Sequence, residues 1–218
     1  MTRAQAEIQK ATQDSTVDFL DGIMYSPTNG VICVGRLTNS ISQSNAKVQW
    51  FTRRHDPWFY IHVQRLQQNP ATPITELIPL VDYLFRYDRG GFWVAKYAFK
   101  YFMTPFNRIT RFILDYYMYT RVMYHALHQS GLSSQYIIQD VAIPYEKADE
   151  FMSYLHADFN NYPVWLCPLK QNGEGTGLIN KKKKAKLPEM MLNFGVVWNP
   201  MLCAHNYRRI WFISGHSP

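Results

Sequence analysis

The hydrophobic pattern near the N-terminus predicts a β-hairpin. Residues 17–26 (VDFLDGIMYS) and 31–37 (VICVGRL) are two runs rich in apolar and β-branched side chains. The Pro-Thr-Asn-Gly segment between them, residues 27–30, has the composition of a tight turn. Because a two-stranded hairpin is marginally stable alone, we expect it to complete a sheet built by other parts of the chain.

The central part of the chain changes from strand-like to helical spacing. Residues 58–64 (WFYIHVQ) form a short apolar run that predicts a strand. From residue 78 to residue 130, apolar and aromatic side chains recur at helical spacing with arginines between them. This pattern predicts a helical insert of two or three helices, with a break at Thr104-Pro105 and an end at Gly131.

The pattern after this insert returns to strands. Residues 135–143, 164–169 and 190–198 are strand-like, and residues 145–158 form an amphipathic helix between the first two of these runs. Together with the hairpin, this order of elements predicts an α+β fold, in which an antiparallel sheet packs with helices and carries the helical insert.

The positive charge is concentrated in one short segment. The formal net charge is +7, and the lysine run Lys181–Lys186 (KKKKAK) supplies much of it. Glycine-rich residues 173–177 and Pro188 flank this run, so we interpret it as an exposed loop. Such a loop can contact anionic lipid headgroups at a membrane surface. No nucleic-acid-binding motif accompanies the lysines, so nucleic acid is not an expected partner.

Motifs that carry chemistry on their own are absent from the sequence. Cys33, Cys167 and Cys203 fit neither a disulfide framework nor a metal site, and they indicate a reducing compartment. His125 and His128 have the i, i+3 spacing of metal ligands but lack a third ligand nearby, so no metal is expected. The sequence contains no phosphate-binding loop, no common hydrolase motif and no run of about 18 apolar residues.

Residues 85–93 (FRYDRGGFW) combine large aromatic rings with two arginines, an aspartate and a Gly-Gly pair. The glycines lack the GxxxxGK[ST] or GxGxxG spacing of a phosphate cradle. From the residues alone, we interpret this segment as the start of the helical insert, with an ion pair between Asp88 and Arg89. An aromatic-rich core is the simplest explanation of the aromatic content of 16%.

Five stretches carry a resemblance to a known family. They are residues 18–39, 85–93, 120–128 (TRVMYHALH), 136–144 (YIIQDVAIP) and 162–169 (YPVWLCPL). In order and spacing, across residues 17–198, they resemble the FAD-linked oxidoreductases of the Δ24-sterol reductase group, of the diminuto/seladin type. This group lies within the vanillyl-alcohol-oxidase flavoprotein superfamily. QDVAIP, followed by a helix and then YPVWLCPL, is the most specific part of the resemblance.

The resemblance implies a division of the chain into parts of a larger flavoenzyme. In that group an N-terminal domain holds FAD, and a C-terminal cap-like domain closes the substrate pocket over the flavin. Residues 1–40 then correspond to the tail end of the FAD-binding domain, residues 41–198 to the cap or substrate domain, and residues 199–218 to a divergent tail. We expect a chain truncated at both ends, inactive alone, that binds FAD weakly or not at all because FAD is held mainly by an absent domain.

For a complete relative, the resemblance implies reduction of an isolated C=C bond in a sterol side chain, with NADPH as the reductant. The expected location is intracellular, at the endoplasmic reticulum membrane or in the cytoplasm. No catalytic proton donor can be assigned. The candidate residues for binding a sterol-like or other apolar small molecule are Tyr87, Arg89, Trp93, Tyr124 and Trp165, and core packing is the alternative role for each.

Two other functions stay open. The chain can belong to a flavin-dependent oxidase or dehydrogenase of alcohols or sugars, because the superfamily varies its substrates through the cap. It can also be a non-catalytic binding fragment, since the FAD domain is expected to be missing.

Overall fold

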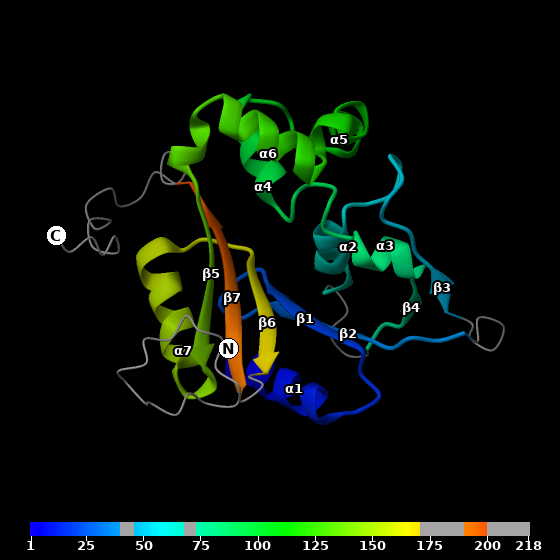
Figure 1. Ribbon diagram of the computed structural model, residues 1–218, viewed down its shortest axis with the longest axis vertical. Helices are drawn as coiled ribbons and strands as arrows, with labels where there is room; N and C mark the ends of the chain where they lie inside the picture. The colour runs from blue at the N-terminus through cyan, green and yellow to red at the C-terminus, as the bar shows by residue number, and fades with distance from the viewer. Residues whose placement is uncertain (40–45, 68–72, 171–189, 200–218) are drawn as a thin grey trace, which may run out of the picture. The chain divides into compact units, whose positions relative to one another are not determined.

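The structure is a computed structural model. It describes residues 1–39, 46–67, 73–170 and 190–199. The chain divides into two compact units. The first unit takes residues 1–43 and 139–196, and the second takes residues 44–138 together with the chain from residue 197. The chain therefore leaves the first unit after the hairpin and returns to it after the helical insert (Figure 1).

A five-stranded sheet forms the first unit. Its strands are β1 (Phe19–Met24), β2 (Gly30–Gly35), β5 (Ile137–Pro144), β6 (Val164–Lys170) and β7 (Met190–Trp198). Their order in the sheet is β2-β1-β6-β7-β5 (Figure 1). β1 pairs antiparallel with β2 and with β6, and β6 pairs antiparallel with β7. The predicted α+β fold, an antiparallel sheet with helices, is confirmed.

Helices α1 (Thr2–Gln13) and α7 (Tyr145–Tyr154) pack against this sheet. α7 begins after Pro144 and buries Tyr145, Ala148 and Met152, whose spacing places them along one stripe of the helix. Alternate residues of the strands point toward the same side, because side chains in a strand have a period of two. The core of the first unit also contains Ile8, Met24, Leu155, Val164, Leu166, Leu192 and Phe194.

The hairpin and the later strands occupy their predicted positions. β1 and β2 pair over their full length, and β1 continues the sheet by pairing with β6. The hairpin thus completes a sheet whose other strands come from the far end of the chain. The division into residues 1–40 as the end of a flavin domain, 41–198 as a cap and 199–218 as a tail stays a prediction.

The second unit is mainly helical. Its helices are α2 (Phe59–Leu66), α3 (Leu80–Leu84), α4 (Val94–Tyr101), α5 (Arg108–Ile113) and α6 (Thr120–Gln129). Two short strands, β3 (Lys47–Val48) and β4 (Glu76–Leu77), pair in parallel. The 3-10 turns Asp115–Met118 and Leu132–Gln135 flank α6. Large rings fill the interior of this unit, and Phe51, Trp58, Trp93 and Phe99 are each at most 2% exposed.

The strand predicted for residues 58–64 is wrong, because most of these residues belong to helix α2. Trp58 is still extended, and the helix after it buries Phe59, Tyr60, Ile61 and Val63. Periodicity does not separate a helix from a strand when a short apolar run is buried on most sides. In this segment the packing of the buried side chains in α2 overrides the strand preference of Ile61 and Val63.

The helical insert has the predicted break and the predicted end. α4 ends at Tyr101, and Thr104-Pro105 separate it from α5, whose first turn is capped by the side chain of Asn107. Gly131 follows α6 in the left-handed conformation, with a φ of 72°, as glycine commonly does after a helix. The insert contains four α-helices, α3 to α6, rather than two or three.

Three predictions concern segments outside the described residues. These segments are the lysine run Lys181–Lys186, the glycine-rich residues 173–177 and the tail beyond residue 199. Contact of the lysines with a membrane surface therefore stays a prediction. Within the described part of the chain, no helix is both long enough and apolar enough to cross a membrane.

Candidate functional site

The turn after Arg89 is packed against a buried tryptophan. Gly90, Gly91 and Phe92 have consecutive positive φ values of 88°, 49° and 58°, a conformation that glycine adopts at little cost. A Cβ atom on Gly90 would lie 2.8 Å from Cε3 of Trp58. Since Trp58 fills the space beside Gly90, this Gly-Gly turn leaves no room there for a phosphate group.

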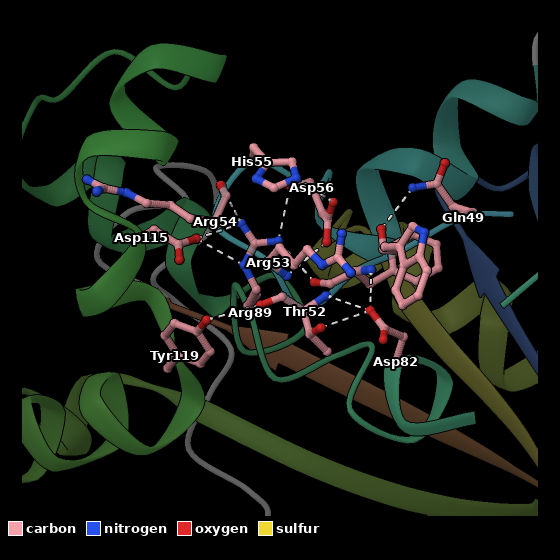
Figure 2. Close-up of polar contacts among 12 residues, drawn as sticks. Gln49, Thr52, Arg53, Arg54, His55, Asp56, Asp82, Arg89, Asp115 and Tyr119 are labelled. Atoms are coloured by element: carbon pink, nitrogen blue, oxygen red, sulfur yellow. Dashed lines mark hydrogen bonds and ion pairs between the residues drawn. The ribbon is translucent and has the colours of Figure 1, made fainter. Parts of the chain in front are cut away.

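Arg89 lies at the centre of a buried polar network (Figure 2). Its Nε and Nη2 atoms donate hydrogen bonds to Oδ1 of Asp115 at 2.9 and 2.6 Å. Nη1 donates to the carbonyls of Phe51 and Asp56, and Nη2 also donates to the carbonyl of Arg54, each at 3.0 Å. A guanidinium has five N–H donors. All of those of Arg89 are directed at the protein itself.

The partner of Arg89 is Asp115, and the predicted pairing with Asp88 is wrong. The carboxylate of Asp88 accepts a hydrogen bond from the backbone N–H of Thr120 at 3.2 Å. Arg89 also forms a β-bridge with Tyr119, so the turn is tied to the start of α6. The Arg89 and Asp115 side chains are only 2% and 5% exposed. A pair this buried is tolerated because its hydrogen bonds compensate the loss of water.

Asp82 makes a second buried polar contact with the loop that precedes α2. Its Oδ1 atom accepts hydrogen bonds from the backbone N–H groups of Phe51 and Thr52 at 2.8 and 3.0 Å (Figure 2). The hydroxyl of Thr52 donates a third bond at 2.9 Å. Burial opposes the charged form, but these hydrogen bonds outweigh it and lower the pKa of Asp82. The loop before α2 is thus bound by Asp82 through its N–H groups and by Arg89 through its carbonyl groups.

Aromatic rings surround this network. Trp58 packs edge-on against Phe99 and Phe106, with ring centroids 6.2 and 5.8 Å apart. Tyr87 stacks on Phe92, with centroids 4.3 Å apart and an angle of 13° between the planes. Edge-to-face and offset-stacked rings are the favoured arrangements of aromatic side chains. Tyr87, Phe92 and Trp93 of FRYDRGGFW therefore take part in the aromatic packing of the second unit, whereas Phe85 is 58% exposed.

The structure brings three of the five sequence-predicted substrate residues into one region. Tyr87, Arg89 and Trp93 belong to the aromatic cluster and its polar network, and Arg89 and Trp93 are buried. Tyr124 lies on α6 with 58% of its surface exposed. Trp165 lies on β6 in the first unit. The burial of Arg89 and Trp93 is what a packing role requires, and substrate binding by the five residues stays a prediction.

A cavity of about 550 Å³ lies beside the Arg89 network in the second unit, a volume within the usual range of small-ligand sites. Among the described residues, Asp56 is the one carboxylate that lines it. The cationic residues that line it are Lys47, Arg54, Arg65, Arg89, Arg108 and Arg111. Of these cationic residues, only Arg89 was predicted from the sequence to belong to a site. The signal available was the i, i+3 spacing of Arg108 and Arg111, which places both on one side of α5.

Comparison with known proteins matches most of this chain to one group of enzymes. A Δ24-sterol reductase of Arabidopsis thaliana is 30% identical over 168 residues, which are 70% of this chain. A Δ24-sterol reductase homologue of Caenorhabditis elegans is 27% identical over 73% of the chain, and the Δ24-sterol reductase of Homo sapiens is 24% identical over 89%. Over these residues the chain is similar to Δ24-sterol reductases. The resemblance predicted from the five stretches is confirmed.

The chain spans only about a third of the length of these relatives. The matched region is 28% of the Arabidopsis thaliana protein, 32% of the Caenorhabditis elegans protein and 37% of the human protein. No protein-family profile matches the chain, and no solved structure matches it. The relatives are named as reductases, so the chain is related to oxidoreductases.

Proposed function

We propose that this chain is the C-terminal substrate-cap portion of an FAD-dependent Δ24-sterol reductase-like oxidoreductase. The observation that carries the proposal is the similarity to named Δ24-sterol reductases over 70% to 89% of the chain, which spans about a third of each relative. In the complete enzyme, FAD with NADPH as reductant supplies the hydride chemistry that reduces a C=C bond of a sterol side chain.

The flavin itself does not fit the glycine turn of this chain. A flavin pyrophosphate is commonly cradled by a glycine-rich turn at the start of a helix. Here the space beside Gly90 is filled by Trp58, and a Cβ atom on Gly91 would lie 2.7 Å from Cε of Met123. The proposal therefore assigns FAD mainly to a part of the complete enzyme other than this turn and its surroundings.

In this proposal the chain contributes exposed aromatic side chains that can contact the substrate, and buried residues that hold other residues in place. Tyr87 and Trp165 are partly exposed and Tyr124 is largely exposed, so each of these rings has surface to offer an apolar ligand. Arg89 and Trp93 are buried and act on a ligand only through the residues that they position. Exposed aromatic rings of this kind can each contact a flat, apolar ring system.

A chimera tests the proposal. In it, this chain replaces the matching region of the Arabidopsis thaliana relative, and the purified protein is assayed with NADPH and desmosterol by mass spectrometry of the sterol product. We expect the reduced sterol. A chimera that keeps its flavin absorption band and its circular dichroism spectrum, but leaves desmosterol unchanged, would contradict the proposal.

The same chimera separates the two alternative functions. Oxidation of alcohols or sugars, without sterol reduction, would favour a flavin-dependent oxidase or dehydrogenase. Binding of desmosterol by the isolated chain, together with an inactive chimera, would favour a non-catalytic binding fragment. The isolated chain should be colourless, because the proposal assigns FAD to another domain.

A further inference from the structure

The cavity of the second unit carries positive charge that nearby carboxylates do not neutralise. Arg89 is compensated by Asp115. Among the residues that the structure describes, no carboxylate lies within ion-pair distance of the other cations of the cavity, which are Lys47, Arg54, Arg65, Arg108 and Arg111. Arg54 donates hydrogen bonds only to the backbone carbonyls of Phe112 and Ile113. Four of the five are arginines, whose planar guanidinium groups suit phosphate.

Asp56, the carboxylate among the described residues of the cavity wall, is engaged by its own loop. Oδ2 of Asp56 accepts a hydrogen bond from the backbone N–H of Arg53 at 2.8 Å. Its Oδ1 atom lies 3.6 Å from Nε2 of His55 (Figure 2). The Asp56 side chain is 9% exposed. Asp56 therefore leaves most of the positive potential of the cavity uncompensated.

Arg111 shows the effect of this charge. Its guanidinium lies over the ring of Phe106, 4.9 Å from the centroid, and it is half-buried. Burial lowers the pKa of Arg111, and the positive charges of Arg65, Arg89 and Arg108 lower it further, against the opposite influence of Tyr60. An anion in the cavity would relieve this repulsion.

We propose that the cavity binds the phosphate groups of an organic phosphate, carried either by a soluble nucleotide or by a phospholipid headgroup. Guanidinium groups pair with phosphate through two parallel hydrogen bonds, which adds geometric specificity to the attraction of the charges. The volume of about 550 Å³ accommodates more than an inorganic ion.

Apolar side chains in the cavity wall suit the organic part of such a ligand. Ile109 and Phe112 line the cavity and are 70% and 45% exposed. The guanidinium of Arg54 lies over the Phe112 ring, 4.3 Å from its centroid. A ring held in this way can stack with a planar group or contact an acyl chain. The proposal does not depend on the sterol reaction.

Titration calorimetry of the full chain with inorganic pyrophosphate tests the site. We expect saturable binding that weakens as sodium chloride is added, because salt screens exposed charges. Arg65→Ala and Arg108→Ala change exposed residues of the cavity, so both variants should fold, and each should raise the Kd about tenfold or more. The matched control is Arg121→Ala, which removes an exposed arginine of α6 that does not line the cavity and should leave the Kd unchanged.

Two further arms identify the source of the phosphate. Displacement of pyrophosphate by NADPH supports a nucleotide site. Co-sedimentation with phosphatidylcholine vesicles that contain phosphatidic acid, lost in Arg108→Ala but not in Arg121→Ala, supports a headgroup site. The proposal is overturned if pyrophosphate, NADPH and phosphatidic acid vesicles all fail to bind. It is also overturned if Arg121→Ala weakens binding as much as Arg65→Ala and Arg108→Ala do.

Discussion

The Arg89–Asp115 pair predicts a large loss of stability when one partner is removed. Arg89→Met keeps the apolar bulk of the side chain but leaves the Asp115 carboxylate and three backbone carbonyls without their donors. Breaking a buried ion pair in this way costs about 3–5 kcal/mol. Since a folded domain is stable by only about 5–15 kcal/mol, Arg89→Met should remove a large part of the free energy of unfolding.

Two more variants separate the effect of the charge on the free energy of unfolding from the effect of the hydrogen-bond geometry. Arg89→Lys keeps the charge but offers three donors from a single nitrogen, which cannot reach Asp115 and the three carbonyls together, so we expect a loss of about 2–3 kcal/mol. Arg89→Met combined with Asp115→Leu removes both charges. Its loss should be smaller than the sum of the two single losses, with a coupling energy of about 2–3 kcal/mol.

Urea unfolding followed by circular dichroism and tryptophan fluorescence measures these free energies. Trp58 and Trp93 are buried in the second unit, so their fluorescence reports on its unfolding. Arg121→Ala is the control and should change stability by less than about 0.5 kcal/mol. The reasoning is refuted if Arg89→Lys stays within about 0.5 kcal/mol of the original chain, or if the losses of Arg89→Met and Asp115→Leu are additive.

Three further variants follow from single contacts. The pKa of Asp82 is lower in the folded chain than in the unfolded chain, so its contribution to stability is present above about pH 4 and is lost as the pH falls. The free energy of unfolding of Asp82→Asn should therefore vary less with pH in the acid range than that of the original chain. Gly90→Ala places a strained Cβ atom 2.8 Å from the Trp58 ring and should cost about 2–4 kcal/mol in urea unfolding, and an unchanged midpoint would contradict this packing. Trp165→Phe removes the hydrogen bond from Nε1 to buried Asp21 and should cost about 1–3 kcal/mol, measured in the same way.

The sheet was predictable from the sequence because its signals are local. The hairpin has two β-like runs around a turn, and α7 has a continuous apolar stripe. Helix α1 was not predicted, because its sequence is largely polar and Ile8 is its one residue in the buried core of the first unit. Such a helix depends on packing with the sheet more than on its own pattern.

The candidate site was less predictable because its contacts are distant in sequence. Arg89 pairs with Asp115, 26 positions away, and its bond to the carbonyl of Phe51 crosses 38 positions. The prediction from adjacent positions in the sequence, an ion pair between Arg89 and Asp88, was wrong. The cations of the cavity come from segments as far apart as Lys47 and Arg111, so no single window of the sequence contained the cluster. Spacing alone excluded a phosphate loop at the Gly-Gly pair, and the i, i+3 spacing of Arg108 and Arg111 was the one local signal of the cavity.

Arg89 differs in role from the other arginines of the cavity. Its donors are all bonded to the protein, so it has none to offer a ligand, but it fixes the carbonyls of the loop that carries Arg54 to the cavity wall. Asp82 fixes N–H groups of the same loop. Loss of Arg89 would therefore weaken anion binding by disordering the wall and would lower stability as well. Loss of the exposed Arg65 or Arg108 would weaken binding while stability stays the same, so the two roles separate when the two quantities are measured on the same variants.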